Sequence, residues 1–154
     1  FDLPRWRAAN GRWGVGSDSH IGVNAAEELM MLEYSQRLQS QQRNVSVSAQ
    51  QPHVASHMML AAVQGGAQAS GRAVAGLAVG QQADFVALDG GHFALAGLAA
   101  AEQLDAHVFA SSRTNAIRQV WAGGQCRVAD GQHTHHRSAQ QAFVAARTAL
   151  IQED

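Results

Sequence analysis

The sequence predicts an α/β fold, and three observations carry that prediction. A short apolar run at residues 13–16 leads through a polar turn to Asn24 and Glu27, the capping-box pattern that begins a helix. Farther along, the hydrophobic period becomes that of strands, with Gly123 and Gly124 placed as a two-residue hairpin turn. The chain then ends on an amphipathic helical pattern at residues 138–151.

The individual elements follow from caps, periodicity and turn residues. A helix ends near Asn10-Gly11, a second runs over about 24–38, and a third runs over about 54–69 and stops at Gly71. The apolar side chains expected on the buried side of the second helix are Leu29, Met31, Leu32, Tyr34 and Leu38. Gly65-Gly66 inside the third helix indicates close packing, because glycine weakens a helix interior. Strands are expected at residues 84–89, 107–110, 116–122 and 125–129.

Composition narrows the class of protein. The 154 residues carry a net charge of −1, and the 11 basic residues are scattered, which gives nucleic-acid binding little support. The sequence contains no run of 18 apolar residues, so a membrane-spanning helix is not expected. The first residues do not have the pattern of a signal peptide. The single Cys126 fits a reducing cytoplasm. Because the chain does not begin with Met and one parallel strand cannot make a sheet, we expect a fragment of a larger α/β protein.

The polar turn at Ser17-Asp18-Ser19-His20 is the candidate site, because α/β enzymes place reactive groups where strands end. The Asp18 carboxylate could ligate a metal or accept a proton, or it could simply form the turn by bonding its own backbone. His20 could orient a substrate or support the loop. Ser17 and Ser19 are expected to donate hydrogen bonds near the site rather than act as nucleophiles, since no His/Asp partner pattern accompanies them.

Other reactive residue types favour structural interpretations. His133, His135 and His136 lie in a polar late loop, where solvated histidines are favoured over a metal site that would need preorganised ligands. Cys126 falls in a predicted strand and is expected to pack rather than react. The aromatic residues expected in cores are Trp13, Trp121 and Phe143.

Two separated motifs carry a family resemblance. Gly16-Ser17-Asp18-Ser19 after an apolar strand resembles the last barrel strand of the amidohydrolase superfamily. Residues 71–72 and 76–89 are similar to the segment by which those enzymes leave the barrel for a small β-sandwich, and residues 120–133 to that sandwich's closing hairpin. Within the superfamily, residues 1–4, 11–20, 26–29 and 32–34 resemble the formimidoylglutamate deiminase family.

The resemblance implies a particular architecture. Residues 1–75 would be the C-terminal end of a metal-dependent (β/α)8 barrel, with its last strand at about 13–17 and helices at about 24–38 and 54–69. Residues 76–135 would supply strands of a composite β-sandwich built from both chain ends, and residues 136–154 a C-terminal helix. Such a barrel takes roughly 250 residues, so this chain would hold only its last part.

The resemblance also implies an activity. The family uses one divalent metal, usually zinc, and Asp18 matches the aspartate that contacts the metal and its water. The implied reaction converts the small molecule N-formimidoyl-L-glutamate to N-formyl-L-glutamate and ammonia in histidine degradation, in a homodimeric enzyme. Guanine, cytosine or S-adenosylhomocysteine deamination is the alternative within the superfamily. The family's His-x-His ligand pair is not matched at any strand end, so the isolated chain is expected to be inactive, and a non-catalytic binding or assembly module is the alternative of another class.

Overall fold

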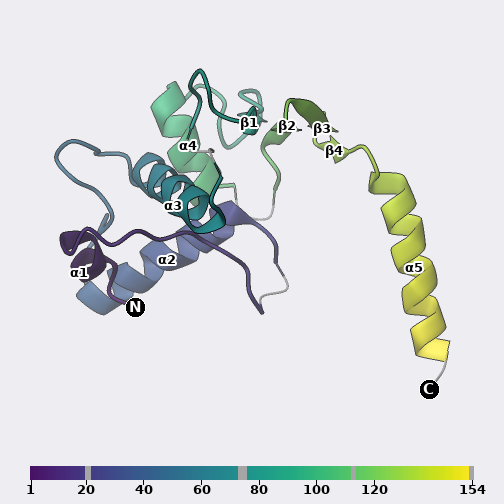
Figure 1. The fold of residues 1–154 in the computed structure, drawn as a ribbon, viewed down its shortest axis with the longest axis horizontal. Helices are drawn as coiled ribbons and strands as arrows, with labels where there is room; N and C mark the ends of the chain where they lie inside the picture. Colours follow the sequence, from purple (N-terminus) through teal and green to yellow (C-terminus); the bar gives the residue numbers. More distant parts are fainter. Residues whose placement is uncertain (20–21, 73–75, 112–113, 153–154) are drawn as a thin grey trace.

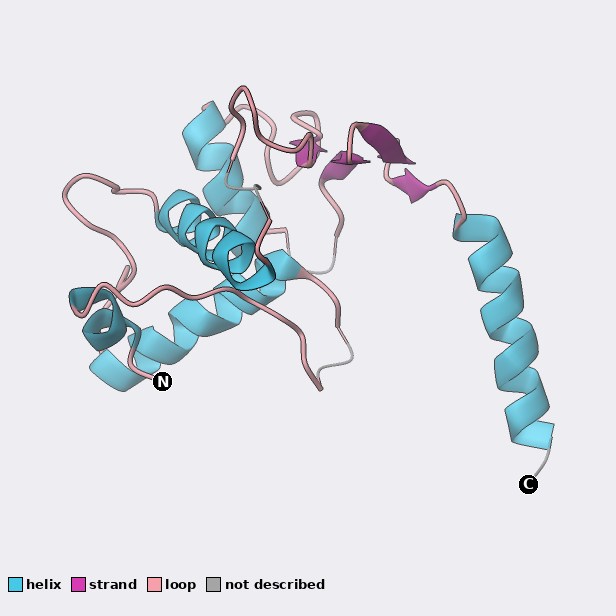
Figure 2. Cartoon of the chain, viewed as in Figure 1, coloured by secondary structure: helices cyan, strands magenta, loops and turns pink. Residues whose placement is uncertain are grey.

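The computed structural model describes residues 1–19, 22–72, 76–111 and 114–152. Four helices form a body, a small antiparallel sheet lies beside it, and a final helix extends away (Figure 1). Figure 2 shows the long loop that joins α2 to α3. The helices are α1 (Leu3–Ala8), α2 (Ala25–Ser40), α3 (Val54–Ser70), α4 (Ala100–Phe109) and α5 (His136–Gln152). The strands are β1 (Phe85–Leu88), β2 (Ile117–Ala122), β3 (Gln125–Ala129) and β4 (Gln132–His133).

The main core lies where α2, α3 and α4 meet. These helices contribute small and medium apolar side chains, which lets their backbones approach closely. The buried members are Ala26, Leu29, Val54, Ala55, Met58, Ala62 and Val108. The expected helices at 24–38 and 54–69 are therefore present, and they meet on a core that also holds the partly buried Trp13.

The buried face of α2 differs from the expected one. Asn24 caps the helix as predicted, since its side chain accepts a hydrogen bond from the Ala26 N–H at 3.0 Å. Leu29 is buried, but Met31, Tyr34 and Leu38 are exposed, so that part of the prediction is wrong. Polar residues take the helical positions in line with Leu29, because Glu33 and Gln36 bond the backbone of other segments. Hydrophobicity alone could not reveal this partly polar interior.

The carboxylate of Asp105 on α4 caps α3 from outside. It accepts a hydrogen bond from the Ala55 N–H at 2.8 Å and lies 2.7 Å from His53 Nδ1. At the other end, Gly71 ends α3 with a φ of 64°, as predicted. The strand expected at 107–110 is wrong, because Leu104 and Val108 recur at helical spacing and face the core from α4.

The sheet has the antiparallel order β1-β2-β3-β4. Gly123 and Gly124 join β2 to β3 with φ values of 59° and 74°, which confirms the predicted hairpin turn. Trp121 stacks on Phe85 across β1 and β2, with ring centroids 5.6 Å apart. The Asp84 carboxylate accepts a 2.6 Å hydrogen bond from the Gly123 N–H, and this bond, aided by Gln82, lowers the pKa of Asp84.

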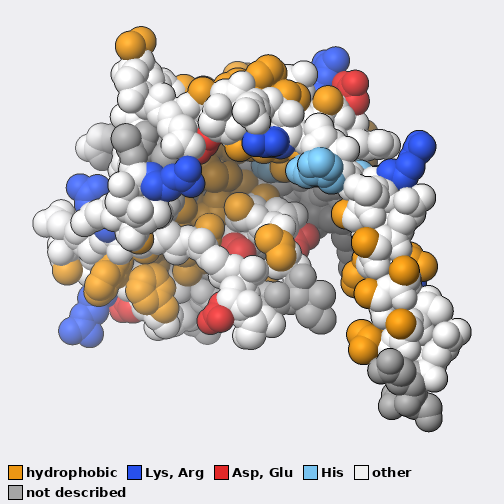
Figure 3. Space-filling model, turned by 45° about the vertical axis from the view of Figure 1, so that its right-hand side comes forward, with side chains coloured by type: hydrophobic (Ala, Val, Ile, Leu, Met, Phe, Trp, Pro, Cys, Tyr) orange, Lys and Arg blue, Asp and Glu red, His pale blue; other side chains and the backbone are white. Residues whose placement is uncertain are grey.

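The final helix α5 confirms the expected C-terminal helix, but all its described residues are exposed. Phe143 is 64% exposed, so the expectation that it packs in a core is not met within the described chain. Figure 3 shows hydrophobic side chains along this extended helix. No helix among the described residues is long and apolar enough to cross a membrane.

Candidate functional site

Residues 11–17 lead to the candidate site without forming the strand expected at about 13–17. A strand is defined by hydrogen bonding to a neighbour, and the strands of the described residues pair only with one another, in the sheet after residue 84. Trp13 packs on the core and Gly14 runs close to α3, but Val15 and Gly16 are exposed, so the expectation of a buried strand is wrong for this segment. The segment instead crosses α3.

Glycine makes that crossing possible. A Cβ atom on Gly65 would lie 1.9 Å from the Trp13 carbonyl oxygen, so no larger residue fits there without displacement. Gly14 runs beside Gly66, the next residue of α3. A Cβ on Gly14 would lie 3.3 Å from the Gly66 nitrogen. The close packing predicted from Gly65-Gly66 is thereby confirmed, and it fixes the path of the chain into the turn.

The segment is also tied to α1. The Trp6 indole N–H donates to the Arg12 carbonyl at 3.0 Å, and the Gly11 N–H donates to the Trp6 carbonyl at 2.9 Å. These bonds satisfy backbone groups of a stretch that has no sheet partner in the described chain. The turn that follows is therefore held from α1 and α3 together.

Asp18 lies at that turn with its side chain exposed. Its φ of 42° is in the left-handed region, which aspartate tolerates better than most residues. No hydrogen bond or ion pair joins Asp18 to another described residue, so the interpretation as an Asp that bonds its own backbone gains no support. Ser17 is half-buried and Ser19 is exposed beside it, whereas His20 lies outside the described residues.

A metal centre needs more ligands than this turn provides. Within the described residues, no group of three His, Cys, Asp or Glu side chains converges. A zinc site takes at least three protein ligands, and the described chain offers one carboxylate, Asp18, at the predicted place. The late histidines His133, His135 and His136 are all exposed, with the rings of the first two 5.6 Å apart.

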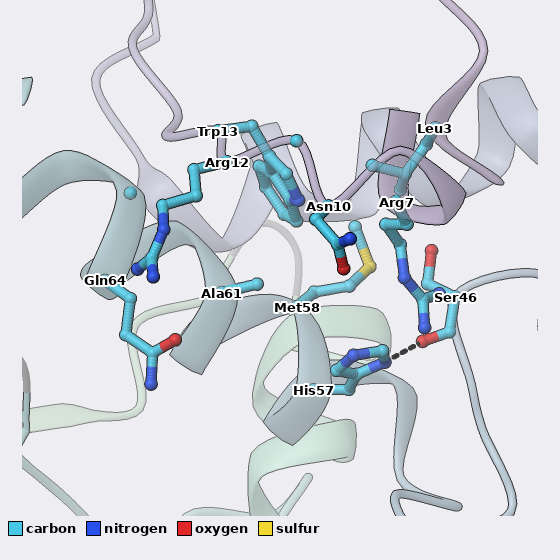
Figure 4. A pocket seen from close by; sticks show the side chains of 12 residues that line it. Leu3, Arg7, Asn10, Arg12, Trp13, Ser46, His57, Met58, Ala61 and Gln64 are labelled. Atoms are coloured by element: carbon cyan, nitrogen blue, oxygen red, sulfur yellow. Dashed lines mark hydrogen bonds between the residues drawn. The ribbon is translucent and has the colours of Figure 1, made fainter. Parts of the chain in front are cut away.

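A pocket that the sequence did not predict lies between α1, residues 10–13 and α3 (Figure 4). Its volume is about 310 Å³, and α1, residues 10–13, α3 and the loop before α3 form its walls. The polar residues that line it are Arg7, Asn10, Arg12, Ser46, His57 and Gln64. These residues are spread over four segments of the sequence without a shared motif, so no sequence signal could have grouped them.

Comparison with known proteins agrees with the sequence motifs. No protein-family model matches the chain. Over 144 residues the chain is 39% identical to a formimidoylglutamate deiminase from Pseudomonas aeruginosa. The crystal structure of an amidohydrolase from Brucella melitensis matches 98% of the chain with a TM-score of 0.84 and 32% identity. The chain belongs to the amidohydrolase superfamily.

A more distant amidohydrolase fold relative extends this comparison. The crystal structure of an adenosine deaminase from Xanthomonas campestris with bound zinc matches 94% of the chain with a TM-score of 0.73 and 19% identity, a level that shows the fold alone. The aligned region makes up 94% of this chain but 32% of the Pseudomonas protein, and the chain covers 33% of the Brucella structure. This amidohydrolase chain thus spans about a third of its relatives, and its mixed helices and antiparallel sheet match the corresponding part of their fold.

Proposed function

We propose that this chain is the C-terminal part of a hydrolase acting on non-peptide C–N bonds, which converts N-formimidoyl-L-glutamate and water to N-formyl-L-glutamate and ammonia. The observation that carries the proposal is the 39% identity to the Pseudomonas formimidoylglutamate deiminase over 94% of this chain. The assignment of this substrate rests on that likeness. The groups that would bind a glutamate carboxylate are expected on earlier barrel loops, outside this sequence.

In this proposal Asp18 is the catalytic residue contributed by the chain. It would supply one oxygen to a divalent metal, expected to be zinc, which when bound lowers the pKa of water toward neutrality. The Asp18 carboxylate would accept a proton as water attacks the formimidoyl carbon and return it to the departing nitrogen, so that ammonia leaves. Its exposure at the turn and its lack of a partner among the described residues support this role. Ser17, Ser19 and His20 would bind or orient groups around it.

The same proposal assigns the surrounding architecture. Residues 13–17 would become the last strand of a (β/α)8 barrel by pairing with chain outside this sequence, and the sheet β1–β4 would complete a β-sandwich. Such an enzyme would need its remaining metal ligands from earlier strands. We further propose a cytoplasmic homodimer, in keeping with the single, half-buried Cys126 and the exposed apolar side chains of α5.

The test is an ammonia-release assay on the full-length protein that contains this sequence, supplied with zinc. We expect turnover of N-formimidoyl-L-glutamate in preference to guanine, cytosine and S-adenosylhomocysteine. Asp18→Asn should lower kcat by about 10²–10⁴-fold, the usual contribution of a positioned proton-transfer group.

Asp130→Asn is the matched control, because Asp130 is an exposed aspartate at a left-handed turn position of the late hairpin region, with a φ of 47°. It should leave turnover unchanged, and both variants should melt near the parent. Preference for one of the other substrates would reject the assigned substrate. Full activity of Asp18→Asn would reject the catalytic role, and absence of any hydrolase activity would favour a binding module.

A further inference from the structure

The pocket between α1, residues 10–13 and α3 carries a second set of polar groups, which the chemistry at Asp18 does not use. We propose that this pocket binds a small anionic molecule whose carboxylate or phosphate group contacts the two arginines. Its walls are drawn in Figure 4, where the Arg7 side chain extends toward Ser46 and His57 and the Arg12 side chain extends toward Gln64.

The pocket is positively charged without a counter-charge in its walls. Arg7 and Arg12 both line it, and no Asp or Glu does. Among the described residues, neither guanidinium has a hydrogen bond or an ion pair with a carboxylate. Each guanidinium offers a planar fork of N–H donors that matches the two oxygens of a carboxylate or phosphate. Two unpaired arginines at one pocket therefore favour an anionic ligand.

Ser46 gives the second, independent observation. The residue is 1% exposed, and its hydroxyl is a buried side-chain polar group with no hydrogen-bond partner in the described chain. Buried hydroxyls are nearly always paired, so this one requires an explanation. Ser46 lines the pocket, and a ligand oxygen that reached this hydroxyl from the pocket would accept the hydrogen bond that the protein does not provide.

Two hydrogen bonds hold the backbone of Ser46 in place. Its N–H donates to the Glu33 carboxylate at 3.1 Å, and its carbonyl accepts a hydrogen bond from His57 Nδ1. With both backbone groups engaged, the hydroxyl is the free polar group of the residue. Donation from Nδ1 also fixes the orientation of the His57 ring at the pocket wall (Figure 4).

Two neighbouring amides add hydrogen-bonding capacity. The side chains of Asn10 and Gln64 line the pocket and make no hydrogen bond to other described residues. An amide carries both donors and an acceptor, so the pair can bond the polar remainder of a ligand beyond its anionic group. The volume of about 310 Å³ lies at the lower end of the range of small-molecule sites, which suits a small metabolite.

The test measures binding by calorimetry to the full-length protein, with inorganic phosphate in one arm and succinate in the other. Saturable binding of phosphate would assign a phosphate ligand, and binding of succinate a carboxylate ligand. Arg7→Gln and Arg12→Gln should each lower the affinity for the anion about tenfold, as expected for loss of a charge-assisted hydrogen bond. Arg5→Gln is the matched control, because Arg5 lies on the same helix but does not line this pocket, and it should leave affinity unchanged.

Ser46→Ala separates a ligand-binding role from a structural one. Because its hydroxyl has no partner in the described chain, its removal should leave the melting temperature of the ligand-free protein unchanged or slightly higher. It should nevertheless reduce the rise in melting temperature that the anion causes. No binding of either anion would overturn the proposal, as would equal losses in Arg5→Gln and Arg7→Gln. The readout is binding, so the result does not depend on whether the protein deiminates formimidoylglutamate.

Discussion

At the scale of single residues, Glu33 links the helical body to the loop that supports the pocket. Its buried carboxylate accepts hydrogen bonds from the Val45 N–H at 2.9 Å, from the Ser46 N–H at 3.1 Å and from Arg37 Nε at 2.8 Å. A charged group taken out of water must be compensated by such bonds, and here all three come from defined donors. Glu33 thus fixes residues 45–46 on α2.

Replacing this carboxylate tests that link. Glu33→Gln keeps the size but loses the charge and one acceptor oxygen, so it cannot satisfy all three donors. We expect a loss of about 3 kcal/mol in the free energy of unfolding, measured by urea denaturation. Glu102→Gln is the control, since Glu102 is exposed near the start of α4 and should cost about 1 kcal/mol or less. Equal losses in both variants would show that Glu33 is not a special support.

At the scale of elements, local signals were predictive and long-range partners were not. The Asn24 cap, the Gly71 stop and the Gly123-Gly124 turn depend on neighbouring backbone groups, and the structure confirms all three. The prediction of a strand at 107–110 was wrong. These residues end α4, where Leu104 and Val108, four residues apart, lie on the same face of the helix. The path into the Asp18 turn was correctly associated with small residues, whereas the pocket depends on contacts between distant segments.

The crossing of residues 13–14 over α3 gives an element-scale prediction. Gly65→Ala adds helix propensity, worth about 1 kcal/mol, but places a methyl group 1.9 Å from the Trp13 carbonyl oxygen. The clash should dominate and cost about 1–3 kcal/mol, as overpacking usually does, and it should also displace the segment that leads to Asp18. Gly66→Ala, whose Cβ would meet nothing within 4 Å, should instead stabilise by up to about 1 kcal/mol. Thermal melting of both variants decides, and the idea fails if Gly65→Ala is as stable as Gly66→Ala.

At the scale of the whole molecule, the described chain has one well-filled helical core and a helix that does not share it. If this chain is the end of a barrel, Val15, Leu29 and Leu32 are expected to present apolar surface to the rest of it. Val15 is 36% exposed, but Leu29 is fully buried and Leu32 is partly buried against the core. The larger exposed contribution comes from α5, where Phe143, Leu150 and Ile151 are each more than 60% exposed. An exposed apolar helix face of this kind promotes association, which can be measured in solution.

The side chains of α5 therefore predict how this chain behaves in solution. Phe143 and Leu150 are seven residues apart and lie on one face of the helix, so the pair Phe143→Gln and Leu150→Gln removes most of that face. We expect the double variant to weaken self-association at least about tenfold in sedimentation experiments and to bind less hydrophobic dye. At concentrations where both proteins are monomeric, its melting temperature should match that of the parent, because α5 buries no side chain in the core. The control pair Ala145→Gln and Ala149→Gln changes the opposite face and should leave association intact, whereas a strictly monomeric parent would contradict the prediction.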